Sequence, residues 1–245
     1  MRQAGIARLG PLLGPARAAE LRSYFEAREV ADPYRPTEGS YLPGSGRRHA
    51  NSHVAFHTAR DVVLAPYLLE LVNRPDLIDL ASRILGCRPT IGYLAAWWSY
   101  ATPIGAQEAE NFHRDVDDWR FLKLFIYLSD VTADDGPHIY VQNSVSSPRL
   151  REIRRFSNEE VVTSFGQENI LTLVGPAGDA FIENTFGLHK GQPVMRGPRL
   201  IFQVVYSMFP VPYGPKKPVA SLNDVGVSAP GRPDPWINRV YLNHP

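Results

Sequence analysis

The order of predicted helices and strands constrains the fold of this chain most strongly. Helical patterns come first, and beyond Gly86 short runs rich in β-branched and aromatic residues alternate with turn signals. The expected strands cover residues 90–100, 111–115, 121–131, 138–141, 170–174, 179–182 and 199–209, with the His189 segment between the last two. A group of helices followed by about eight strands favours a β-barrel or double-sheet jelly roll with N-terminal helices against it. Such barrels can enclose a ligand cavity.

The remaining segments divide the chain into parts of one domain, since all-β units often reach this length. We expect an arm and helical support over residues 1–88, a jelly-roll core over 89–209 and a Pro-rich tail over 210–245. Helices are expected at 15–30, 65–73 and 75–85, with a polar helical insert at 147–167. The long loop at 31–50 and the tail are candidate lids over a site.

Composition narrows the possible partners. Hydrophobic residues make up 44% of the 245 residues, which permits a sizeable core. The net charge is +1 without a basic stripe, so we do not expect nucleic-acid binding. No apolar run reaches the length of a membrane span. Cys87 is the only cysteine, which excludes an internal disulfide and predicts a cytoplasmic, reducing location.

Two histidines and one aspartate form the candidate metal site. His113 and Asp115 stand two apart on an expected strand, so their side chains point to the same face. His189, which lies in a segment flanked by glycines, can complete a face of two imidazoles and one carboxylate. This ligand set, with open positions opposite it, is typical of non-heme Fe(II) oxygenases. Arg199 supplies a planar guanidinium for a carboxylate and suggests a dicarboxylic co-substrate.

In this order the residues resemble the phytanoyl-CoA dioxygenase family of Fe(II)- and 2-oxoglutarate-dependent oxygenases. The resemblance covers roughly residues 60–209 and rests on 111–115, 122–131, Gly136-Pro137, Gly178-Asp179, His189 and Arg199. It implies a double-stranded β-helix, the jelly-roll or cupin-like fold. It also implies His113, Asp115 and His189 as Fe(II) ligands, Arg199 as the anchor for the far carboxylate of 2-oxoglutarate, O2 as oxidant and a small-molecule substrate. Asn111 occupies the place of an amide that family members often carry before the first ligand.

Two features bear on the reaction. Halogenating relatives replace the ligand carboxylate with a small residue, so Asp115 favours hydroxylation, with desaturation or ring chemistry as further outcomes. The family commonly ends its Gly-Pro strand with Gly-Ser-His, whereas this chain has Asn143, Ser144 and Val145 there. Because that histidine is not an iron ligand, its loss leaves the metal site intact but weakens any inference about substrate class.

Several orientations stay open from the sequence. If Lys123 and Tyr127 face inward, the ammonium can assist 2-oxoglutarate binding and the phenol can line the pocket; otherwise Lys123 lies in solvent and Tyr127 in the core. Trp97 and Trp98 face opposite sides of their strand, so one belongs to the core and the other can line the cavity.

Other polar residues have competing interpretations. His49, His53 and His57 are spaced by four, but the sequence around His53 is a poor helix, so a pocket-rim position for His53 is favoured over a second metal site. Asp117 and its neighbour Asp118 are expected to be solvated turn residues.

Two other functions are compatible with a jelly roll. One is a cupin-like hydrolase or isomerase that holds Zn(II) or Mn(II) in the same ligands. The other is a binding module that has lost catalysis, whose sign would be a broken ligand set or a missing carboxylate anchor; the sequence retains both sets of residues.

Overall fold

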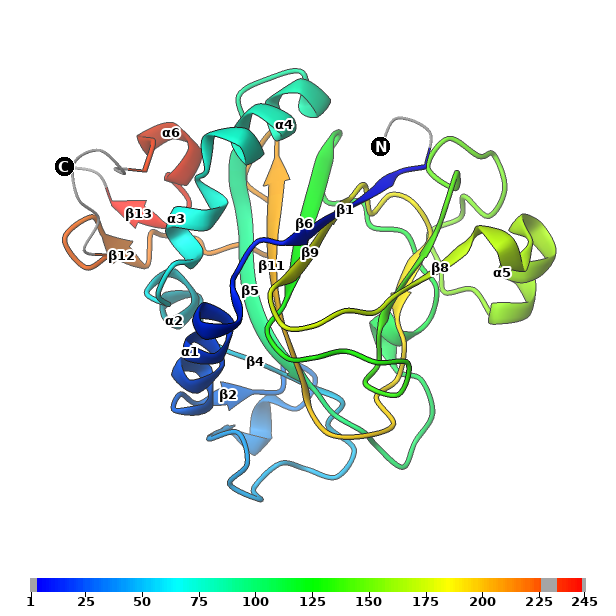
Figure 1. Ribbon diagram of the computed structural model, residues 1–245, viewed down its shortest axis with the longest axis horizontal. Helices are drawn as coiled ribbons and strands as arrows, with labels where there is room; N and C mark the ends of the chain where they lie inside the picture. The colour runs from blue at the N-terminus through cyan, green and yellow to red at the C-terminus, as the bar shows by residue number, and fades with distance from the viewer. Residues whose placement is uncertain (1–3, 226–232, 244–245) are drawn as a thin grey trace.

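Two antiparallel sheets that face each other form the centre of the molecule (Figure 1). The structure, a computed structural model, describes residues 4–225 and 233–243. In spatial order the larger sheet has β1 (Ile6–Pro11), β9 (Asp179–Glu183), β6 (Phe121–Tyr127), β11 (Arg199–Ser207), β5 (Thr90–Ser99), β4 (Val54–Phe56), β2 (Val30–Ala31) and β3 (Ser40–Tyr41). The smaller sheet has β10 (His189–Gly191), β7 (His138–Val141) and β8 (Ile170–Leu173).

The chain passes repeatedly between these two sheets. After β5 and β6 of the larger sheet it forms β7 and β8 of the smaller one, returns through β9, crosses to β10 and ends in β11. An isolated bridge joins His113 to His189 of β10, and a second joins Phe112 to Phe156. This alternation is a jelly roll, which confirms the fold class expected from the sequence.

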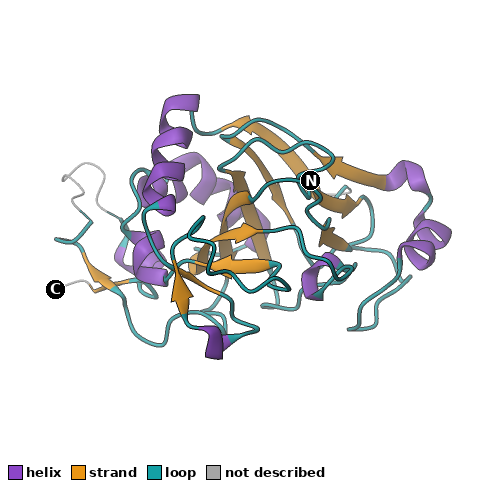
Figure 2. Ribbon diagram, turned by 90° about the horizontal axis from the view of Figure 1, so that it is seen from below, coloured by secondary structure: helices purple, strands orange, loops and turns teal. Residues whose placement is uncertain are grey.

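Helices cover the outer face of the larger sheet (Figures 1 and 2). They are α1 (Pro15–Glu26), α2 (Ala59–Val63), α3 (Leu68–Val72) and α4 (Pro75–Leu85). The smaller elements elsewhere are η1 (Pro36–Glu38), η2 (Glu108–Glu110), α5 (Asn158–Phe165), η3 (Gln167–Asn169), α6 (Pro235–Asn238) and the parallel pair β12 (Ala220–Ser221) and β13 (Leu242–Asn243). Among the described residues, no helix has the length and apolar character needed to cross a membrane.

Strand alternation decides which side chains reach the space between the sheets. On β11, Leu200, Phe202, Val204 and Tyr206 belong to the core shared with the helices. The intervening Arg199, Ile201 and Gln203 instead line a cavity between the sheets. The same rule places Trp98 of β5 in the helical core and Trp97 at the cavity. The core and cavity positions of the two tryptophans are thereby settled.

Some elements differ from the sequence expectation. The arm contains β1, which pairs with β9 at the edge of the larger sheet, and the 31–50 loop contributes β3 and flanks β2 and β4. The helix expected at 65–73 is shortened to α3, and α2 before it was not expected; Pro66 between them lacks the backbone N–H that a continuous helix requires. Residues 111–115 do not form a regular strand. Residues 226–232 and 244–245 of the predicted tail lie outside the described residues.

Candidate metal centre and cavity

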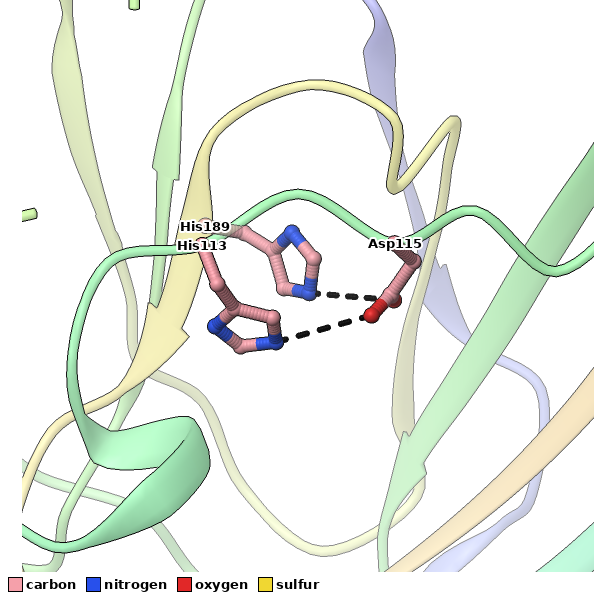
Figure 3. Close-up of side chains that lie close together, drawn as sticks. All are labelled: His113, Asp115 and His189. Atoms are coloured by element: carbon pink, nitrogen blue, oxygen red, sulfur yellow. Dashed lines mark ion pairs between the residues drawn. The ribbon is translucent and has the colours of Figure 1, made fainter. Parts of the chain in front are cut away.

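His189 converges with His113 and Asp115 although it lies far from them along the chain (Figure 3). Each offers one ligand atom, and these three atoms lie within 4.8 Å of one another. The backbones of His113 and His189 exchange two hydrogen bonds of 3.0 and 3.1 Å, which holds the two residues directly opposite each other. The Asp115 amide donates to the Thr185 carbonyl at 2.9 Å and so fixes the third residue. Backbone pairing therefore performs the alignment that a regular strand was expected to provide.

The second ring nitrogen of each histidine is held by a backbone carbonyl. His113 Nδ1 lies 2.9 Å from the carbonyl oxygen of Asn111, and His189 Nδ1 lies 2.9 Å from that of Gly187. Since a carbonyl oxygen only accepts, Nδ1 must carry the hydrogen in both rings. In the neutral rings the Nε2 lone pairs then point toward Asp115, at 3.6 Å for His113 and 3.2 Å for His189. This tautomer and its second hydrogen bond are what a metal-binding imidazole requires.

Charges around the ligand set also suit a cation. Burial lowers the pKa of His113 to about 3, which keeps this imidazole neutral. Burial opposes ionisation of Asp115, but Lys123 and His189 outweigh it and hold the pKa of Asp115 well below its ordinary value. The site thus presents a carboxylate and a neutral imidazole at the same point, as the donor set for a divalent metal requires.

Lys123 faces inward and bridges two carboxylates. Its ammonium nitrogen lies 2.6 Å from Asp115 Oδ2 and 2.9 Å from Asp117 Oδ2. The solvent-facing alternative for Lys123 is therefore wrong. The expectation that Asp117 is a solvated turn residue is wrong as well, because its side chain is only 10% exposed in this ion pair. Binding of 2-oxoglutarate by Lys123 stays a prediction. The contact that the structure shows is with Asp115, whose carboxylate Lys123 holds in place.

The ligand set opens into a cavity of about 350 Å³ between the sheets. Arg199 lies in its wall, 5% exposed, where it donates to Ser99 Oγ at 2.8 Å and to the carbonyl of Gly136. Among the described residues, its buried Nε has no hydrogen-bond partner and its guanidinium has no ion-pair partner. A buried, uncompensated guanidinium is costly, so this position fits a carboxylate of a bound molecule.

Aromatic pairs line the rest of the cavity. Phe56 and Trp97 stack with centroids 5.3 Å apart, and Tyr34 and His53 stack at 5.4 Å. Tyr213 from the tail completes the wall against Tyr93 at 4.8 Å. The rim position favoured for His53 agrees with this lining. Tyr34 and Tyr213 come from the two segments considered as lids, but nothing in their sequence surroundings distinguished them from other tyrosines.

Three further predicted residues have clear locations. The Asn111 side chain approaches the carbonyls of Ala106 and Glu108 at 3.4 and 3.5 Å, and the cavity-lining residues in the described part of the chain do not include it. Its predicted contact with the co-substrate stays a prediction, while its own carbonyl orients His113. The Tyr127 hydroxyl donates to the Leu173 carbonyl at 2.7 Å and belongs to the core between the sheets. His57 accepts from Trp98, and no second metal cluster occurs among the described residues.

Comparison with known proteins supports the fold. The sequence matches no protein-family model and no curated protein sequence. The structure is similar to that of the non-heme alpha-ketoglutarate-dependent carbocyclase SnoK from nogalamycin biosynthesis, with a TM-score of 0.59 and 18% identity over 84% of this chain and 80% of SnoK. For AviO1 from Streptomyces viridochromogenes Tue57 the TM-score is 0.57, with 23% identity over 87% of this chain and 94% of AviO1.

A third similar structure is that of HygX from Streptomyces hygroscopicus with nickel, 2-oxoglutarate and hygromycin B bound. Its TM-score is 0.58, with 14% identity over 97% of this chain and 94% of HygX. At these identities the similarity establishes a shared fold, and the chemistry has to be argued from the residues of this chain.

Proposed function

We propose that this protein is an Fe(II)- and 2-oxoglutarate-dependent oxygenase of the phytanoyl-CoA dioxygenase type that acts on a small molecule. One observation carries the proposal: His113, Asp115 and His189 converge at a cavity whose wall also holds the buried, unpaired Arg199. Two imidazoles and one carboxylate form the facial ligand set of non-heme Fe(II) oxygenases. The bound nickel and 2-oxoglutarate in HygX, which shares the fold, lend further support.

The residues of this chain have separable tasks in such a reaction. Bound Fe(II) with 2-oxoglutarate would supply O2 activation coupled to oxidative decarboxylation, which releases succinate and CO2. His113 and His189 would coordinate the metal through the lone pairs of Nε2, and the carbonyls that accept from their Nδ1 atoms keep these rings oriented. Lys123 holds one oxygen of Asp115. Arg199 pairs with the distal carboxylate of the co-substrate, and the aromatic walls exclude water from the reacting atoms.

The same arguments extend to substrate and outcome. A cavity of about 350 Å³ with aromatic walls suits a small molecule rather than a polymer. SnoK, HygX and this protein share a fold, and the HygX structure contains hygromycin B, which is consistent with a small natural product as substrate.

Because Asp115 occupies the third ligand position, we propose hydroxylation rather than halogenation. The product should gain one oxygen atom and no chlorine when chloride is present, as mass spectrometry would show.

The central test uses purified protein with Fe(II), 2-oxoglutarate and O2. Succinate should form slowly without substrate, and His113→Ala, Asp115→Ala or His189→Ala should abolish its formation. Each histidine substitution should also weaken Fe(II) binding by more than the roughly 10- to 100-fold that outer partners of metal ligands contribute. The matched control is His49→Ala, since His49 is exposed and its Nδ1 only accepts from the Asn51 amide.

Two outcomes would contradict the proposal. Fe(II) that remains bound after loss of both His113 and His189 would disprove the ligand assignment. Tight binding of Zn(II) or Mn(II) with substrate conversion that consumes neither O2 nor 2-oxoglutarate would favour the cupin-like hydrolase or isomerase instead.

A further inference from the structure

His138 lies on the cavity wall between the metal ligands and Arg199. On β7 it pairs with Gly191, two residues beyond His189 on β10, and its ring stacks on that of His189 with centroids 5.6 Å apart. On the other side, Arg199 donates to the carbonyl of Gly136, two residues before His138. Arg199 Nη2 also stands 3.8 Å from the place of a Cβ on Gly191. A molecule that spans from the metal ligands to Arg199 therefore passes the His138 ring.

A buried carboxyl group holds one nitrogen of this ring. His138 Nε2 lies 2.8 Å from Glu183 Oε1, and Glu183 is 0% exposed on β9 of the opposite sheet. Phe125 and Phe181 pack beside His138, with ring centroids 5.0 and 5.1 Å from its own. Within the described residues Nδ1 makes no hydrogen bond, and the ring lines the cavity. The imidazole is thus fixed at one nitrogen and available at the other.

The surroundings favour a neutral pair. Among the described residues, the second oxygen of Glu183 is buried without a hydrogen-bond partner, an environment that penalises a carboxylate. Burial accordingly raises the pKa of Glu183 to about 8. A neutral carboxyl group donates to Nε2, and a neutral imidazole that accepts at Nε2 carries its hydrogen on Nδ1. The pair then presents an N–H group to the cavity.

We propose that His138 is a co-substrate-binding residue, whose Nδ1–H group donates a hydrogen bond to a carboxylate of 2-oxoglutarate. Glu183 is a positioning residue that selects this donor form of the ring. This inference rests on the proposed function and adds a polar contact between the metal end of the co-substrate and Arg199. It gives a reason for a fully buried acid that makes no contact in the metal centre itself.

The test is calorimetric titration of 2-oxoglutarate into Mn(II)-loaded protein, which measures binding without turnover. His138→Leu should raise the Kd for 2-oxoglutarate at least about tenfold, because a hydrogen bond to a charged acceptor is lost. His138→Gln restores an amide donor and should recover part of the affinity. Phe181→Leu alters packing beside the same ring without changing a polar atom, so its Kd should match that of the wild type.

Glu183 is tested through the form of the ring it selects. The amide of Glu183→Gln can donate to Nε2, so this variant should bind 2-oxoglutarate about as tightly as the wild type. Glu183→Leu offers no donor and should raise the Kd severalfold. Mn(II) affinity measured without 2-oxoglutarate should be unchanged in all five variants. If the substitutions acted only by disturbing His189, Mn(II) affinity would fall instead.

The outcomes separate the two proposals. Normal 2-oxoglutarate affinity in both His138 variants would overturn the role of His138 while leaving the proposed function intact. A loss of Mn(II) affinity that accounts for the weaker 2-oxoglutarate binding would also overturn it, since His138 would then support the metal ligand. If the wild-type protein binds Mn(II) but the Mn(II)-loaded protein does not bind 2-oxoglutarate, the proposed function fails and this inference fails with it.

Discussion

At the residue scale, the charges of the cavity fall into two groups. Asp115 and Asp117 are compensated within the protein by Lys123. Arg199, by contrast, is buried without an acidic partner among the described residues. A folded chain tolerates an uncompensated buried charge when a ligand completes it. From this difference we predict that Lys123 affects stability and metal binding, whereas Arg199 affects ligand binding.

Lys123→Met should destabilise the metal-free protein by about 3 to 5 kcal/mol, the usual effect of removing one partner of a buried ion pair. The loss should be smaller with Mn(II), because the metal supplies positive charge beside Asp115. Urea unfolding with and without Mn(II) measures both values. Lys217→Met is the control, since this exposed side chain should change stability by less than about 0.5 kcal/mol.

Adding Asp117→Asn should recover part of the stability lost in Lys123→Met, since one of the two uncompensated carboxylates is then gone. A contrary result is that Lys123→Met loses the same stability with and without Mn(II), and that the double variant recovers none of it. That result would show that the ion pairs of Lys123 with Asp115 and Asp117 do not cause the destabilisation.

At the scale of elements, local patterns predicted some structure closely. The helix at 75–85 has Pro75 in its first turn, Gly86 in the left-handed conformation after its end, and buried Leu77, Ala81 and Leu85 on one face, and its predicted bounds agree with α4. The strand at 138–141 follows a Gly-Pro turn signal and matches β7. Each of these signals lies within a few residues of the element it defines.

Elements that depend on distant pairing were not predictable from the same signals. The β1 strand is stabilised by β9, more than 160 residues away, and β2 and β3 have two residues each, too few for a periodic pattern. The segment at 111–115 has strand-like composition, but only Phe112 and His113 form bridges. Long-range hydrogen bonds decide the conformation of these segments.

The candidate site shows the same division. His113, Asp115, His189 and Arg199 could be found because residue type and order carry the signal. The pairing of His138 with Glu183 depends on how two sheets face each other, which no local spacing reveals. Gln203 could have been found, since alternation along the strand from Arg199 places it on the cavity face.

His57 connects the larger sheet with the helices. Its Nε2 accepts a hydrogen bond from the Trp98 indole of β5 at 3.2 Å, and its ring centroid lies 4.6 Å from that of Phe25 in α1. Burial lowers the pKa of His57 to about 4, whereas the unfolded chain has an ordinary value near 6.5. Between these values the unfolded state binds more protons, so the stabilising effect is full above about pH 6.5 and is lost as the pH falls toward 4.

Metal-free wild-type protein should therefore lose about 2 to 3 kcal/mol from this group between pH 7.5 and pH 4.5. His57→Gln retains an acceptor for the Trp98 N–H group and does not titrate, so its stability should fall less over that range. Urea unfolding of both proteins at each pH gives the comparison. Identical pH dependence in the two proteins would rule out His57 as the source.

At the scale of the whole molecule, the cavity lies where the two sheets meet. His189 belongs to β10 of the smaller sheet, Arg199 begins β11 of the larger one, and Arg199 also bonds the turn before β7. A ligand that contacts both ends therefore links the sheets directly. Because it binds only when the sheets are correctly placed, it should stabilise the folded molecule as a unit.

Thermal unfolding should report this linkage. In Mn(II)-loaded protein, 2-oxoglutarate at one hundred times its Kd should add about 2.7 kcal/mol, which raises the Tm by about 5 to 10 °C for a chain of this size. Arg199→Gln should abolish most of that shift at the same concentration, because the carboxylate loses its guanidinium partner. Arg196→Ala removes an arginine whose side chain is 77% exposed and pairs with Asp134, so it should keep the wild-type shift. A shift of equal size in Arg199→Gln would mean that 2-oxoglutarate stabilises the protein from a site other than this cavity.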